Sequence, residues 1–73
     1  QGVTKMKLSA RNQIHGKIVS IDLGVTTARV KIDVGHGIVI TSSITNEAVD
    51  DLGLAVGDSA VAVIKASDVI IGK

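Results

Sequence analysis

The chain has 73 residues, no Cys, no Phe, Tyr or Trp, and a formal net charge of +1. A domain this small buries a limited share of its surface, and the lack of Cys excludes disulfides and thiolate metal sites as supports. The small net charge and the lack of base-stacking rings argue against a nucleic-acid-binding surface. Because hydrophobic residues still make up 45% of the chain, we expect another subunit to cover part of the apolar surface.

The two ends of the chain bear on its location and its domain limits. The longest apolar run, 60–64, is far too short to cross a bilayer, and no charged-then-apolar signal segment opens the chain. We therefore expect a cytoplasmic protein with no membrane partner. Residues 1–5 are predicted to be a disordered leader or a remnant of an expression vector, which leaves 6–73 as the folded domain. The chain does not begin with Met, so the interpretation as a fragment of a larger protein stays open.

Three strands are predicted in the first part of the chain. The first covers 12–22, where Gly16 indicates a bulge or a close backbone approach. A glycine turn leads to the second strand, 26–34, in which apolar and polar residues alternate. The glycine-rich connection 35–37 then predicts a hairpin to a third strand, 38–44.

A short helix is predicted over 46–52, after the three strands. Thr45 can cap it by accepting from its first free N–H groups, Glu47 favours the helix N-terminus, and Gly53 ends it. The next strand, 59–65, carries Ala, Val and Ile on both faces. Both faces of such a strand must be packed against other elements. We expect one face to pack within the domain and the other against another chain.

A short last strand is predicted at 69–71. Three strands, a helix and two further strands follow one another in the order of an OB-like barrel. The predicted fold class is therefore all-β: a small five-stranded OB-like barrel with one short helix between the third and fourth strands. An SH3-like barrel is the alternative.

Few residues suit catalysis. The chain has no Cys or Tyr nucleophile, and His15 and His36 have no partner at a triad or metal-ligand spacing. Asp50 and Asp51 are expected on a solvated helix face. The segment 35–37 is too short for a phosphate loop and opens no helix. We predict that the protein is not an enzyme and offers no direct ligands to a metal ion.

Three polar clusters are rich in hydrogen-bond donors: 8–13 (LSARNQ), 41–43 (TSS) and 65–68 (KASD). Each can be interpreted as a turn or a strand face that bonds its own backbone. A tetrahedral oxyanion, in contrast, accepts hydrogen bonds on every side and avoids carboxylates. The clusters offer such hydrogen-bond donors: hydroxyls, one Arg, one Lys and the backbone amides of turns. The three clusters therefore favour an oxyanion site, and a subunit interface would bury its charges.

The same clusters resemble a known family. The segment 9–13 followed by Gly16-Lys17-Ile18 is similar to the opening of molbindins, and of the molybdate-binding modules of molybdate-responsive regulators and transporter ATPases. The segment 63–70 (VIKASDVI) is similar to their end. Between them the family's pattern continues in order through Gly24-Val25-Thr26, Ile40-Thr41-Ser42-Ser43-Ile44-Thr45, Leu52-Gly53-Leu54 and Gly57. The resemblance covers about 8–71.

The resemblance implies a strand-swapped OB-like fold that assembles as a homohexamer, a trimer of dimers. It implies molybdate or tungstate as the bound ligand at subunit interfaces, without an organic cofactor, and a role in intracellular molybdenum storage and homeostasis. The residues that it assigns to the oxyanion are Ser9, Ala10 and Arg11 from the first motif and Lys65, Ala66 and Ser67 from the last. Some relatives carry Ser where this chain has Ala66, so there only the amide, or Ser67, can replace the hydroxyl.

A second anion site is also an expectation. Its candidate residues are Thr41, Ser42 and Ser43, together with the backbone of 21–25, on a symmetry axis of the assembly. Two alternatives to a stand-alone binding protein remain: a ligand-sensing module of a larger protein, and a small β-barrel interaction module without a small ligand.

Overall fold

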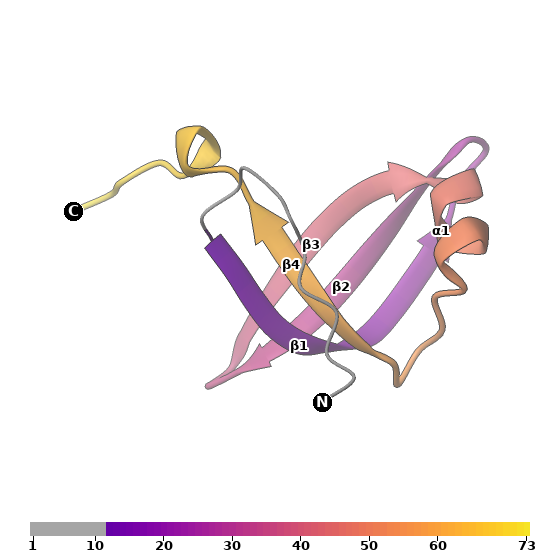
Figure 1. Ribbon diagram of the computed structural model, residues 1–73, viewed down its shortest axis with the longest axis horizontal. Coiled ribbons are helices and arrows are strands. Elements are labelled where there is room, and N and C mark those ends of the chain that lie inside the picture. Colours follow the sequence, from indigo (N-terminus) through magenta and orange to yellow (C-terminus); the bar gives the residue numbers. More distant parts are fainter. Residues whose placement is uncertain (1–11) are drawn as a thin grey trace, which may run out of the picture.

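The computed structural model describes residues 12–73, so the predicted leader and the candidate residues Ser9, Ala10 and Arg11 lie outside the described part. The described elements are β1 (Asn12–Leu23), β2 (Thr27–Gly35), β3 (Ile38–Thr45), α1 (Asn46–Leu52), β4 (Ser59–Ile64) and the 3₁₀ turn η1 (Ala66–Asp68). The four strands form one curled sheet in the order β3-β2-β1-β4, with antiparallel neighbours throughout (Figure 1). Among the described residues, no helix is long and apolar enough to cross a membrane.

The core lies on the inner face of this sheet. In β2 the predicted alternation is confirmed, because Ala28, Val30 and Ile32 are buried whereas the residues between them are exposed. Ile18, from the centre of β1, is only 1% exposed. Val49 of α1 and Ala62 of β4 complete this small apolar cluster.

A bend lets β1 pair with two strands. Its first half, from Asn12 to Lys17, pairs with β4, and its second half, from Lys17 to Leu23, pairs with β2. A Cβ built on Gly16 would lie 2.6 Å from the carbonyl oxygen of Asp33. This confirms the predicted close backbone approach at that glycine. The register then shifts between Ile18 and Ser20, and such a bulge strengthens the twist of a strand.

The helix has the predicted bounds and the predicted cap. The backbone N–H of Ala48 donates to Oγ1 of Thr45 at 3.0 Å, which satisfies one of the first free donors. Gly53 ends α1 in the left-handed conformation, with φ of 62°, which glycine adopts without steric cost. Val49 is the buried residue of the helix and packs on the core.

The predicted fifth strand is wrong for the described chain. After η1, residues 69–71 are irregular and run away from the sheet (Figure 1). Ile70 and Ile71 are 92% and 85% exposed. A strand needs a neighbour that exchanges backbone hydrogen bonds with it, and the tail has none among residues 12–73.

Gly16→Ala is expected to lower the free energy of unfolding by about 1–3 kcal/mol, the usual cost of overpacking. The added methyl group would meet a backbone carbonyl, which cannot rotate away as a flexible side chain can. Gly72→Ala is the matched control, because a Cβ there meets nothing within 4 Å. Urea unfolding, at one fixed protein concentration, measures both. Equal stabilities of the two variants would contradict this account of the bend.

Candidate functional site

The last polar cluster forms an exposed turn at the end of β4. The carbonyl of Lys65 accepts from the N–H of Asp68 at 2.9 Å, and the carbonyl of Ala66 accepts from that of Val69 at 3.2 Å. Lys65, Ala66 and Ser67 are all exposed. Within the described residues, the N–H groups of Ala66 and Ser67 appear in none of the loop and cap hydrogen bonds. The turn therefore offers an ammonium group, a hydroxyl and two backbone amides to a ligand.

Strand pairing brings Asn12, at the described end of the first polar cluster, next to this turn. Asn12, which directly follows Arg11 in the chain, is the register partner of Ile64, which directly precedes Lys65. The side chain of Asn12 also donates from Nδ2 to the carbonyl oxygen of Ile64 at 3.2 Å. Asn12 and the Lys65 turn, more than fifty residues apart in sequence, thus lie at the same end of the β1–β4 pair.

The middle cluster is divided by the alternation of β3. Thr41 and Ser43 are exposed, and Ser43 lies opposite Arg29 in the antiparallel register. Ser42 is half-buried on the opposite face, opposite the core residue Val30. The three residues therefore do not converge on one point, because consecutive strand residues point to opposite sides of a sheet.

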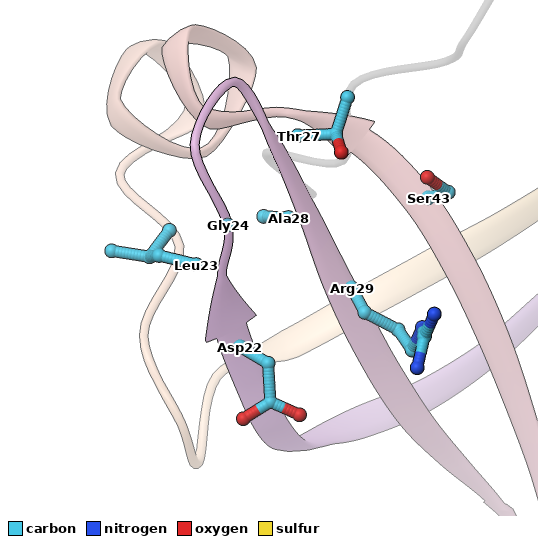
Figure 2. A pocket seen from close by; sticks show the side chains of 7 residues that line it. All are labelled: Asp22, Leu23, Gly24, Thr27, Ala28, Arg29 and Ser43. Atoms are coloured by element: carbon cyan, nitrogen blue, oxygen red, sulfur yellow. The ribbon is translucent and has the colours of Figure 1, made fainter.

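A polar cleft of about 260 Å³ lies where β1 turns into β2 (Figure 2). It is lined by Asp22, Leu23, Gly24, Thr27, Ala28, Arg29 and Ser43. The cleft thus joins one residue of the middle cluster to part of the 21–25 backbone, as the second-site hypothesis requires. The charges of Asp22 and Arg29 offset each other, so a dianion bound here would need further positive charge or further donors.

The sequence did not single out Arg29. In β2 its position marks it only as one of several polar residues on the outer face. Its relevance depends on the pairing with β3, which brings Ser43 opposite it. No local signal in the sequence carries that information.

An apolar groove lies on the inner face of the sheet and has a volume of about 480 Å³. The residues that line it are Ile18, Val30, Ile32, Ser42, Ile44, Leu52, Leu54, Ser59, Ala60 and Val61. It opens between β3 and β4, the two edges of the curled sheet. Among residues 12–73, no group of three His, Cys, Asp or Glu side chains is placed to hold a metal ion.

Comparison with known proteins identifies the family. The model of the TOBE domain matches residues 8–71. The chain belongs to the TOBE domain family, as a Mop-type molbindin. It is 51% identical to a probable molybdenum-pterin-binding protein of Haemophilus influenzae, over 92% of this chain and 97% of that protein.

Two solved structures extend the comparison to this TOBE domain's fold. MopII from Clostridium pasteurianum superposes with a TM-score of 0.85 at 42% identity, over 92% of this chain and all of that one. The cytoplasmic molybdate-binding protein ModG, solved with molybdate bound, superposes with a TM-score of 0.84 at 49% identity. That match covers 89% of this chain and 46% of ModG.

Proposed function

We propose that this TOBE domain binds molybdate through the Lys65 turn and the adjoining first motif, and that it serves intracellular molybdenum storage and homeostasis. The observation that carries the proposal is the pairing of Asn12 with Ile64, which supports a site shared by the two motifs. The names of the relatives, which describe binding of molybdate or of molybdenum-pterin, support the same ligand.

The proposed site balances the charge of its ligand. Arg11 and Lys65 supply two positive charges for a dianion, and Ser9 and Ser67 supply hydroxyl donors. The backbone amides at Ala10 and Ala66 complete a donor set without a carboxylate acceptor, as a tetrahedral oxyanion requires. Tungstate has the same charge and shape and nearly the same size as molybdate, so we propose that it binds too, with no organic cofactor.

The chain is proposed to act as a strand-swapped homohexamer, a trimer of dimers, in the cytoplasm. An added strand from another chain would lie in the open groove between β3 and β4 and complete a five-stranded OB-like barrel. Exposed apolar side chains support such an assembly: Val25 is 98% exposed, and Ile70 and Ile71 nearly as much. Contact with another chain would remove these apolar side chains from water, which is favourable.

A second oxyanion site is proposed at the polar cleft. Ser43 and Arg29 would bind from the outer face of the sheet, and the 21–25 backbone from its rim. Thr41 lies on the same face, opposite Lys31, and would extend the donor set. Ser42 faces the groove instead, which makes it the weakest of the three candidates.

One alternative function has an observation in its favour. The chain spans 46% of ModG, so a module of this kind also occurs within a longer protein. The domain would then be the ligand-sensing module of a larger molybdate-responsive regulator or transporter ATPase. The full open reading frame distinguishes the two, because a DNA-binding or ATPase domain beside this one would favour the alternative.

Lys65→Ala is expected to weaken molybdate binding by about tenfold to a hundredfold, because a hydrogen bond from a charged group contributes about 1.5–3 kcal/mol. Lys17→Ala removes the same charge from an exposed position of β1 and should leave the affinity unchanged. Calorimetric titration with molybdate, with sulfate as the ligand control, measures both variants. Equal affinity in Lys65→Ala and the wild type would remove the proposed site.

Ser43→Ala is expected to weaken a second class of bound molybdate by about fivefold to tenfold, the loss of one neutral hydrogen bond. Ser42→Ala is the matched control, since the neighbouring hydroxyl points to the other face of β3. Equilibrium dialysis, with molybdenum counted per chain, gives the number of occupied sites. If Ser42→Ala lowers that number and Ser43→Ala does not, the second site is not at the polar cleft.

A further inference from the structure

Asn46, the first residue of α1, donates hydrogen bonds to the backbone of the turn between β1 and β2. Its backbone N–H donates to the carbonyl oxygen of Thr26 at 2.9 Å. Its side-chain Nδ2 donates to the carbonyl oxygen of Gly24 at 2.9 Å and to that of Val25 at 3.3 Å. One residue thus holds three consecutive carbonyl groups of a turn that lies twenty to twenty-two positions earlier in the chain.

The orientation of the Asn46 amide follows from these contacts. Its Oδ1 is buried and has no hydrogen-bond partner among the described residues. The reverse orientation would place Oδ1 against the carbonyl oxygens of Gly24 and Val25, which repel it. Nδ2 therefore faces the turn even though Oδ1 is left without a donor there.

Holding the carbonyls fixes the direction of the neighbouring amides. In a planar trans peptide the C=O and the next N–H point in opposite directions. The carbonyls of Gly24 and Val25 point to Asn46, so the N–H groups of Val25 and Thr26 point away from it. Neither donates to a backbone or side-chain acceptor in residues 12–73, and Val25 is 98% exposed. Successive N–H groups on one side of a turn form a concavity that suits an anion.

The turn also adjoins the polar cleft. Leu23 and Gly24 line that cleft together with Arg29 and Ser43, as Figure 2 shows. The amides of Val25 and Thr26 follow directly after Gly24 in the chain, although neither residue is among those that line the cleft. A ligand that reached from these amides into the cleft would meet the Arg29 guanidinium and the Ser43 hydroxyl, and also the Asp22 carboxylate.

We infer that Asn46 is the positioning residue of the second oxyanion site: it keeps the carbonyls of 24–26 turned inward and so presents the amides of Val25 and Thr26 to molybdate. This inference rests on the proposed function, since it names a determinant of one of the two proposed sites. Asn46 itself does not touch the ligand. It acts through the conformation of the turn.

The first test uses the wild-type protein and two-dimensional ¹H–¹⁵N NMR. Titration with molybdate is expected to shift the amide resonances of Val25 and Thr26, and sulfate at the same concentration is expected to shift them much less. Molybdate binding that is weakened by Lys65→Ala but leaves these two resonances in place would overturn the inference. The proposed function would then still stand. If no molybdate binds at all, both fail together.

The second test compares Asn46→Ala and Asn46→Asp with Thr45→Ala. Asn46→Asp keeps the size of the side chain and suits the first turn of a helix, but it replaces the Nδ2 donor with an oxygen. Thr45→Ala removes the cap bond to Ala48 at the same helix end and contacts no carbonyl of the turn. Both Asn46 variants are expected to lose molybdate binding at the second site and to keep binding at the site that depends on Lys65. Thr45→Ala is expected to keep binding at both sites.

The comparison separates positioning from general stability. Each variant loses hydrogen bonding at the start of α1, two bonds from Asn46 and one to Thr45, so all three melting temperatures should fall. Only the Asn46 variants should lose the response of the Val25 and Thr26 amides. Equal losses of second-site binding in Thr45→Ala and the Asn46 variants, or none in any of them, would overturn the inference.

Discussion

The close approach of β1 to β2 at Gly16 is the constraint on which the rest of the structure depends. The absence of a Cβ there lets the backbone of β1 lie against the carbonyl of Asp33, and the strand then bends. Because of the bend, one strand pairs with β4 through its first half and with β2 through its second half. The pairing with β4 places Asn12 beside Ile64, next to the Lys65 turn. The proposed molybdate site would thus depend on a glycine that lies outside it.

The curled sheet that results is open. Its edges, β3 and β4, are separated by an apolar groove, and only six residues are buried in the described chain. A core of this size contributes little stability for a single domain. Ligand binding and assembly both stabilise the folded state by mass action, so binding at a subunit interface would couple the two. Such a coupling would stabilise a small chain that has neither disulfides nor aromatic side chains.

Local features of the sequence were enough to predict most of the fold. The strict alternation in β2, the Thr45 cap and Gly53 each act over a few residues, and the structure confirms all three. The fifth strand at 69–71 was wrong because a strand exists only with a partner, and the apolar pattern of the tail does not say where that partner is. An apolar tail is equally suited to contact another chain.

The candidate site was predictable only in part, for a similar reason. The donor-rich turn at Lys65 is contiguous in sequence and could be found there. The cluster at 41–43 was also contiguous, but the alternation of β3 sends Ser42 to the groove and Ser43 to the cleft. Arg29 and Asn46 were missed because their roles arise from contacts between distant segments. Arg29 depends on strand register, and Asn46 on the approach of α1 to a turn that it does not adjoin in the chain.

The central claim is that the binding site and the complete fold belong to an assembly of several chains. Native mass spectrometry of the purified protein, with and without molybdate, tests it most directly because it reports the number of chains and of bound anions in one species. We predict that molybdate is found only on an oligomer, with six chains as its main form. A folded monomer that binds molybdate as well as the oligomer does would contradict the account.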